Sequence, residues 1–207
     1  MPDVIPLPTA LVMLDYFGIA VFAVSGALLA AEKRQTFVTF VFFAVVTGVG
    51  GGTLRDLLIG APVFWVHTNS FLMVCIAAAL AVWFTGTSHR LAGRALLWFD
   101  AAGIAAYATY GTAKALAFGV APVPAFAMGV MTACVGGIIR DVLAGQPSIL
   151  MRRELYVTAA ALAAGLFVGL SLAGLAIWPA AAIAFGSGFA LRGAAIQRGW
   201  SLPSYGD

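Results

Sequence analysis

The sequence predicts an all-α membrane protein of seven transmembrane helices, with two inverted-topology three-helix repeats followed by a seventh helix. Three observations lead to this fold class: the composition, the spacing of the apolar runs, and an internal repeat. Of the 207 residues, 62% are hydrophobic and only 9% are charged, whereas soluble domains carry about 25% charged residues. We therefore expect a single transmembrane domain over residues 1–207.

Apolar runs separated by polar residues, glycines or prolines mark the seven candidate spans. A helix needs about 20 apolar residues to cross the hydrocarbon core of a bilayer. The runs near this length are residues 9–31, 37–60, 70–86, 95–117, 123–145, 156–173 and 175–192.

Basic residues lie in alternate loops of this arrangement. The loops on the other side contain no Lys or Arg beyond Arg55 and Lys114, which are close to span ends. Because positively charged loops face the cytoplasm, we expect a cell (inner) membrane protein with its N-terminus outside and its C-terminus cytoplasmic. The net charge of +3 is spread along the chain, which argues against a nucleic-acid partner. The basic loop residues are Lys33, Arg34, Arg90, Arg94, Arg152, Arg153, Arg192 and Arg198.

The phrase GGGTLRD at residues 50–56 recurs as GGIIRD at residues 136–141, with an offset of 85 positions. The same offset, without a gap, predicts two homologous halves, repeat one at about 11–86 and repeat two at about 95–173, and leaves an extra helix at about 175–192. Because each half has three spans, the second must enter the membrane from the opposite side. The offset pairs Asp15 with Asp100, Gly18 with Gly103, Gly26 with Gly111, Thr47 with Thr132, Arg55 with Arg140, and Asp56 with Asp141.

Consecutive glycines weaken a helix and permit a local break. Carbonyls freed by a break are tolerated in the membrane only where they are buried or face water, and they can replace part of a cation's hydration shell. We therefore predict a pore or ion site at the paired motifs. The alternative is that the glycines only allow close helix packing. The predicted pathway residues are Gly50, Gly51, Gly52, Gly136 and Gly137, with oxygens from Thr47, Thr53, Thr132, Ser25 and Tyr110.

Charged residues in the spans predict two equivalent clusters, Asp15–Arg55–Asp56 toward the outer side and Asp100–Arg140–Asp141 toward the inner side. A charge at the bilayer centre costs about 2.5–3.5 kcal/mol, so it should be paired or face water. We expect each arginine to pair with the aspartate of the neighbouring span, while the second aspartate faces the path or a backbone donor. These clusters either gate the path or only brace the repeat interface.

Lys114 breaks the repeat, because its mate at the same offset is Leu29. Its place near the end of a span allows two interpretations. The side chain extends to the membrane interface, or it faces the pathway as a voltage-sensitive gating element.

Nothing in the sequence suggests catalysis. His67 and His89 are expected in loops on opposite sides, and Cys75 and Cys134 each lie alone in an apolar run, where a cysteine acts as a small apolar side chain. We therefore predict that the chain is not an enzyme and has no metal site or resident cofactor.

The seven spans, the three-plus-three repeat and the paired glycine–arginine motifs resemble the prokaryotic branch of the trimeric intracellular cation (TRIC) channel family, from about Asp15 to Arg192. The resemblance implies a homotrimer in which each subunit has its own pore for monovalent cations, chiefly potassium. It also implies that spans two and five bend at their glycines to line that pore. The matching positions are Gly50, Gly51, Gly52, Arg55, Asp56, Gly136, Gly137, Arg140 and Asp141, with Val135 where a third glycine of the second motif would stand.

Members of this kind have also been labelled as glycine transporters. A secondary transporter of a small amino acid such as glycine is therefore the alternative to a passive potassium channel. The ligands expected are the permeant potassium ion and bound lipid, since basic cytoplasmic loops attract anionic headgroups.

Overall fold

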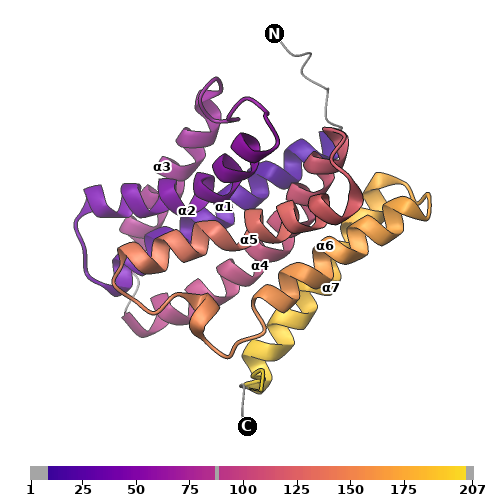
Figure 1. Cartoon of the computed structure of the whole chain (residues 1–207). Helices are drawn as coiled ribbons and strands as arrows, with labels where there is room; N and C mark the ends of the chain where they lie inside the picture. The colour runs from indigo at the N-terminus through magenta and orange to yellow at the C-terminus, as the bar shows by residue number, and fades with distance from the viewer. Residues whose placement is uncertain (1–8, 87–88, 204–207) are drawn as a thin grey trace.

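The computed structural model describes residues 9–86 and 89–203, and these ranges fold into seven α-helices and one short 3-10 helix (Figure 1). The predicted all-α fold is confirmed. The fourth helix begins at His89 and not near residue 95, so this histidine lies at a helix start and not in a loop. The helices are α1 (Thr9–Glu32), α2 (Phe37–Leu58), α3 (Asn69–Thr85), α4 (His89–Ala117), α5 (Pro122–Leu143), η1 (Ile149–Met151), α6 (Val157–Leu172) and α7 (Ile177–Arg198).

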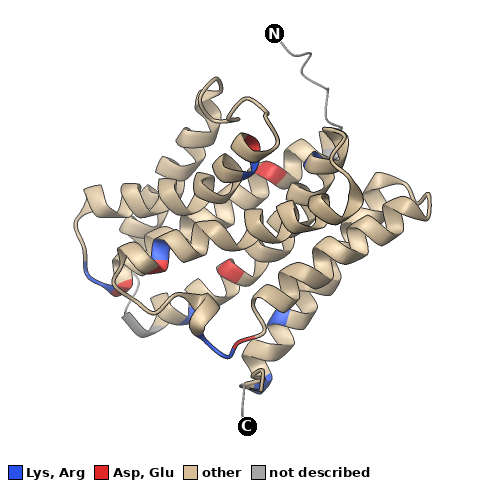
Figure 2. Ribbon diagram, in the orientation of Figure 1, with Lys and Arg blue, Asp and Glu red and all other residues tan. Residues whose placement is uncertain are grey.

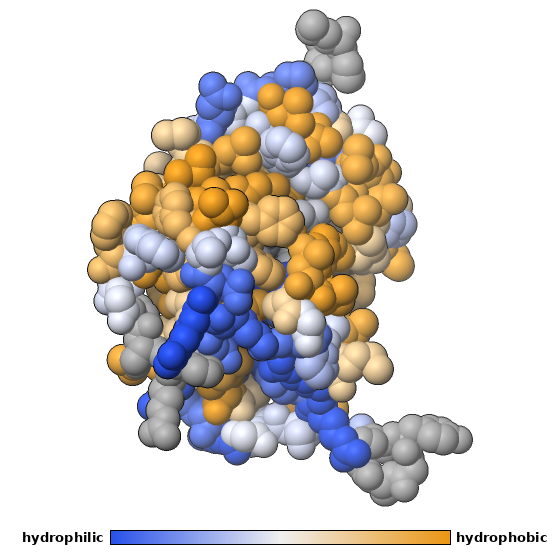
Figure 3. Space-filling model, turned by 90° about the vertical axis from the view of Figure 1, so that its left-hand side faces the viewer, coloured by the Kyte–Doolittle hydropathy of each residue, from blue (hydrophilic) through white to orange (hydrophobic). Residues whose placement is uncertain are grey.

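The outside of the bundle suits a lipid environment. Four of the described helices, α1, α2, α5 and α7, are long and apolar enough to cross a membrane, and α3 and α6 are shorter apolar helices. Large apolar side chains such as Val38, Phe84 and Val123 are exposed. Figure 3 shows one face of the molecule, on which hydrophobic side chains cover much of the surface. The charged residues form an upper group and a larger lower group in Figure 2.

The helices pack in a pattern that occurs twice. The first helices of the two repeats, α1 and α4, pack against each other at the centre of the bundle. α2 and α3 lie against α1, and α5 and α6 lie against α4 in the same way (Figure 1). α2 also packs against α5, and α7 packs against α4 and α6. The contacts of the first three helices are thus matched by those of the next three.

The crossing of α1 and α4 shows that the repeats are inverted. A Cβ added at Gly18 would lie 2.6 Å from Tyr107 Cδ1, and one added at Gly103 would lie 2.9 Å from Phe22 Cδ1. These are the same contact made twice, because Gly103 and Tyr107 are the repeat mates of Gly18 and Phe22. The partner's number falls as the residue number rises, so the two helices run antiparallel. A pseudo-two-fold axis therefore passes through this crossing.

Candidate functional site

Helices α2 and α5 cross at their glycine motifs, and the two crossing contacts are again repeat mates. A Cβ added at Gly51 would lie 2.1 Å from the carbonyl oxygen of Thr132, and one added at Gly136 would lie 2.4 Å from that of Thr47. No side chain fits at such distances, so only glycine permits this approach of the two backbones. Because α2 and α5 pair in antiparallel directions through repeat mates, the pseudo-two-fold axis also passes through the centre of this crossing.

The predicted local break in the helices at these glycines is wrong, whereas the bend that the resemblance implies stays a prediction. α2 runs without interruption from Phe37 to Leu58, and α5 runs from Pro122 to Leu143. Close packing, the alternative considered from the sequence, is what the glycines provide. A helix keeps its own hydrogen bonds when glycines face a neighbouring backbone, so a glycine pair alone does not unwind it.

At Gly52 and Gly137, the absence of a side chain leaves space for a side chain of the loop that follows the helix. A Cβ on Gly52 would lie 2.7 Å from Phe64 Cε1, and one on Gly137 would lie 2.6 Å from the Tyr156 hydroxyl. Gly50 is less confined, because the nearest atom to its added Cβ is Ile139 Cδ1 at 3.4 Å. The paired motifs are thus packed on two sides, by the opposite helix and by their own loops.

The three predicted pathway threonines lie at or near this crossing. Thr132 Oγ1 donates to the carbonyl oxygen of Met128 at 2.6 Å, and Thr53 Oγ1 donates to that of Val49 at 2.7 Å. Thr47 Oγ1 is buried without a hydrogen-bond partner among the described residues. One free hydroxyl oxygen therefore lies beside the axis.

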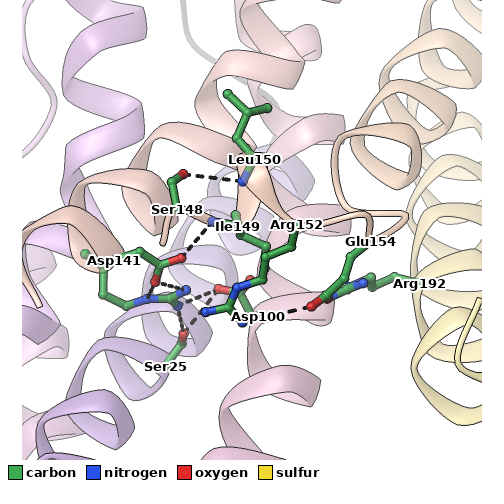
Figure 4. Close-up of polar contacts among 10 residues, drawn as sticks. Ser25, Asp100, Asp141, Ser148, Ile149, Leu150, Arg152, Glu154 and Arg192 are labelled. Carbon is green, nitrogen blue, oxygen red and sulfur yellow. Dashed lines mark hydrogen bonds and ion pairs between the residues drawn. The ribbon is translucent and has the colours of Figure 1, made fainter. Parts of the chain in front are cut away.

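The inner cluster is a network around Arg140, whose side chain is almost completely buried, and of its carboxylate oxygens only Asp100 Oδ2 is buried without a hydrogen-bond partner among the described residues. Its Nε donates to Asp141 Oδ1 at 2.9 Å, and its Nη1 donates to Asp100 Oδ1 at 2.7 Å and to Ser25 (Figure 4). Asp141 Oδ2 accepts from the backbone nitrogen of Ile149 at 3.1 Å. Arg140 thus joins α5 to both central helices, since Asp100 lies on α4 and Ser25 on α1.

The outer cluster repeats the first part of this geometry. Arg55 Nε donates to Asp56 Oδ1 at 2.9 Å, and Asp56 Oδ2 accepts from the backbone nitrogen of Phe64 at 3.1 Å. The Arg55 guanidinium does not bind an aspartate of the central helices. It lies over the ring of Tyr110 on α4, with Cζ 4.9 Å from the ring centroid.

Lys114 belongs to the outer cluster, so its extension to the membrane interface is wrong. Its Nζ donates to Asp56 Oδ2 at 3.0 Å, and its side chain is buried. The ammonium has a carboxylate partner inside the bundle, which removes the need to reach water. Asp56 therefore holds two cations, whereas the repeat mate of this contact would join Asp141 to Leu29 and cannot form.

Asp15 is less closely held than the sequence suggested. Among the described residues no ion pair within 4 Å joins it to Arg55, and its buried Oδ1 has no hydrogen-bond partner. Arg55 acts on it only through longer-range attraction, and Tyr110 is its neighbour on α4. The difference from Asp100 arises at one pair of repeat mates, Ser25 and Tyr110: the small serine lets Arg140 reach Asp100, whereas the tyrosine ring lies against Arg55.

The charge balance of the two clusters differs as a result. The outer cluster has two cations, Arg55 and Lys114, and two carboxylates, Asp15 and Asp56. The inner cluster has one cation and two carboxylates, so it is formally negative. Within the described residues, no group of three or more His, Cys, Asp or Glu is placed to bind a metal ion.

Sequence reasoning missed an ion pair beside the inner cluster. Arg192 on α7 binds Glu154 in the loop before α6, and its guanidinium lies 5.6 Å from the ring centroid of Tyr156. In the sequence, Arg192 and its neighbours indicated only membrane orientation. No periodic signal connects residues 38 positions apart in sequence, so the pair follows only from the packing of α7.

Comparison with known proteins finds the same two halves. The family model described as "Glycine transporter" matches twice, at residues 12–87 and 97–171. A UPF0126 membrane protein of Vibrio cholerae serotype O1 is 43% identical over 151 residues, which are 72% of this chain and 63% of that protein, slightly under two thirds of its length. The UPF0126 inner membrane protein YadS of Escherichia coli strain K12 is 41% identical over 148 residues, covering 70% of this chain and 72% of YadS.

Solved structures of TRIC channels share the whole fold. The TRIC trimeric intracellular cation channel orthologue from Rhodobacter sphaeroides superposes with a TM-score of 0.89 and 42% sequence identity, over 93% of this chain and 100% of that chain. A prokaryotic TRIC channel in 0.5 M KCl gives a TM-score of 0.86 at 25% identity, over 94% and 99% of the two chains. The resemblance to TRIC channels suggested by the sequence is confirmed.

Proposed function

Because this chain belongs to the family described as "Glycine transporter" and has the fold of TRIC channels, we propose that it is a cation channel that conducts potassium passively through a pore in each subunit. The family description is a label and carries no substrate by itself. The structural relatives include TRIC cation channels, and this similarity favours conduction over coupled transport. We further propose no enzymatic activity.

One observation mainly supports the proposal. Buried charged clusters lie at both ends of the α2–α5 crossing inside a single subunit. Charges there are costly unless they are paired or face water, and they commonly mark ion pathways. Thr47, Thr53 and Thr132 lie between these clusters on the same two helices. The backbones touch at Gly51 and Gly136, which leaves no room for an ion between them. We therefore propose that ions move beside this contact and that α2 and α5 shift when the channel opens.

The arginines agree with cation conduction because carboxylates hold them. Asp56 partly neutralises the charges of Arg55 and Lys114. In the inner cluster the two negative charges of Asp100 and Asp141 exceed the single positive charge of Arg140. We propose that Lys114 gates the outer end, since one charge moved through 100 mV changes the energy by about 2.3 kcal/mol. A cation released from Asp56 into the path would repel potassium, and a cation held by Asp56 would not.

The assembly and orientation are part of the same proposal. We propose a homotrimer in an inner membrane, with the N-terminus outside and the C-terminus cytoplasmic. Relatives are named as trimeric channels and as inner membrane proteins, and alternate loops are basic as the orientation requires. Light scattering of the purified protein gives the number of subunits. Labelling of single cysteines introduced at residues 34 and 68 gives the orientation, with residue 34 protected in intact cells.

Recording from the purified protein in planar bilayers tests conduction. We expect unitary current steps and, under a potassium chloride gradient, a reversal potential close to the potassium equilibrium potential. Replacing potassium with a large organic cation should abolish the current. Glycine uptake into proteoliposomes that contain the protein is the opposing measurement. Saturable uptake driven by a sodium or proton gradient, together with an absence of unitary current steps, would show a transporter and refute the channel.

A further inference from the structure

A pocket of about 410 Å³ with charged side chains in its wall lies beside the inner cluster, between the loop that follows α5 and the end of α7. Leu97 of α4 forms part of its wall, one helical turn from Asp100. Figure 4 shows two of its arginines and Glu154 next to the Arg140 network. The residues that give the pocket its polar character are Arg152, Arg153, Glu154, Arg192 and Ser201.

The C-terminal segment closes one side of this pocket. Helix α7 ends at Arg198, and the positive φ of 65° at the following Gly199 turns the chain back toward the loop. The backbone nitrogen of Leu202 then donates to the carbonyl oxygen of Arg153 at 2.7 Å, and Glu154 and Ser201 form an isolated antiparallel β-bridge. Two segments distant in sequence are thus fastened together, so the pocket is a constructed part of the fold.

Two buried or half-buried arginines of the pocket, Arg152 and Arg192, depend on one carboxylate. Glu154 is shared between Arg192 and Arg152, and the Arg152 contact is long, with Nη1 3.9 Å from Oε1. Arg192 is 2% exposed, and its Nε has no hydrogen-bond partner among the described residues. A buried guanidinium with an unused donor is costly, and an anion with several acceptor oxygens would satisfy it.

We propose that this pocket binds a phosphate group, carried by the headgroup of an anionic membrane lipid or by a small soluble phosphate. Arginine forks match phosphate oxygens in pairs, and a tetrahedral phosphate offers oxygens to more than one fork at a time. The pocket lies at the end of the bundle that is predicted to be cytoplasmic. Anionic headgroups and soluble phosphates are both present there, and the chemistry of recognition is the same for both.

The bound phosphate would also act on the inner end of α5. Tyr156 links the two places, because its ring lies against Arg192 and its hydroxyl lies against Gly137. A phosphate that draws Arg192 away from Glu154 therefore changes the packing on the glycine motif. This regulatory step rests on the proposed channel function, whereas the binding itself does not.

Two binding measurements on the purified full-length protein distinguish the sources of phosphate. Native mass spectrometry after exposure to mixed micelles counts phosphatidylglycerol retained against phosphatidylcholine. Thermal unfolding in detergent compares inorganic phosphate with chloride at equal ionic strength. Retention of phosphatidylglycerol alone identifies a lipid headgroup, and stabilisation by inorganic phosphate alone identifies a soluble ligand; either result supports the pocket.

Matched variants locate the binding. Arg152→Gln lies at the partly exposed rim and should fold normally, and it should weaken whichever ligand binds by about tenfold. Arg34→Gln removes the same charge from the exposed loop after α1 and should leave the affinity unchanged. Equal weakening by both variants would mean general attraction to basic loops and would overturn the proposal. Absence of both ligands from the wild-type protein would overturn it as well, whatever the bilayer recordings show.

Discussion

The outer and inner charge clusters begin from the same short motif and end as different networks. In both, the arginine Nε binds the next aspartate at 2.9 Å, and that aspartate accepts a backbone N–H from eight residues further along. Beyond this shared part, Arg140 binds Asp100 directly. Arg55 instead lies over the ring of a tyrosine, and Lys114 forms a second ion pair with Asp56.

The comparison separates what a repeated motif determines from what its surroundings determine. The Arg-Asp geometry depends on residues within one helix and its following loop, and it is the same in both halves. The partners from the central helices depend on two pairs of repeat mates, Ser25 with Tyr110 and Leu29 with Lys114. One difference in each of these two pairs therefore converts a symmetric frame into a balanced outer cluster and a negative inner one.

The largest expected effect is the difference between the two arginines. Arg140→Ala leaves Asp100 and Asp141 buried without a cation, and should cost about 3–5 kcal/mol of stability. Arg55→Ala should cost less, because Lys114 still neutralises Asp56. The midpoint of thermal unfolding in detergent, together with the yield of folded protein on gel filtration, measures both. Equal losses would contradict the asymmetry of the clusters.

At the centre of the molecule the two halves should respond alike. Gly51→Ala and Gly136→Ala each place a methyl group against a carbonyl oxygen of the opposite helix, and each should lose about 1–3 kcal/mol. Gly50→Ala is the matched control in the same motif, since its methyl group would lie at ordinary contact distances, 3.4 Å from Ile139 Cδ1 and 3.9 Å from Gly136 Cα. Thermal unfolding of the three variants would refute the crossing if Gly50→Ala were the most damaging.

Lys114→Leu places the repeat mate's side chain in the outer cluster and should lower stability by about 1–2 kcal/mol, because Asp56 keeps Arg55 and the Phe64 N–H. If Lys114 gates the outer end, the current–voltage relation in planar bilayers should also lose its dependence on the sign of the voltage. Lys33→Leu, in the exposed turn that follows α1, is the control. An unchanged current–voltage relation in Lys114→Leu would show that Lys114 does not gate the channel and only stabilises the outer cluster.

The smallest expected effect concerns a hydrogen bond that only the outer half has. Trp65 Nε1 donates to Thr53 Oγ1 at 2.8 Å, and the repeat mates of these residues are Leu150 and Ile138. Thr53→Val should cost about 1 kcal/mol through the loss of this bond. Thr109→Val loses only a bond to its own helix and should change the thermal midpoint less. The opposite order would show that the indole contact contributes nothing.

Much of the fold followed from the sequence, because composition and the 85-residue offset report on properties of the whole chain. The offset also grouped Asp100, Arg140 and Asp141, which the structure brings together. Whether α2 and α5 are broken or continuous at their glycines could not be predicted from the sequence, since adjacent glycines suit both an unwound helix and a close crossing. Only the approach of the Thr132 carbonyl oxygen to Gly51 decides between them.

The partners of single side chains were the least accessible to sequence reasoning. Lys114 lies near the end of a helix, where both an interfacial and a buried position are possible, and the choice depends on Asp56 from another helix. Asp15 was grouped with Arg55 by repeat symmetry, but the Tyr110 ring lies where the inner half has only Ser25. Such local departures from symmetry are tertiary effects, so a repeat offset cannot report them.

The contacts at Gly18, Gly51 and their mates have a consequence for the origin of the chain. Each crossing is self-complementary, so two identical three-helix chains inserted in opposite directions would make the same contacts across the axis. A gene for one half could therefore have produced an antiparallel homodimer with these same crossings before the halves were joined. Fusion fixed the two orientations, and from then on Lys114 and Tyr110 could differ from Leu29 and Ser25 without a matching change on the other side.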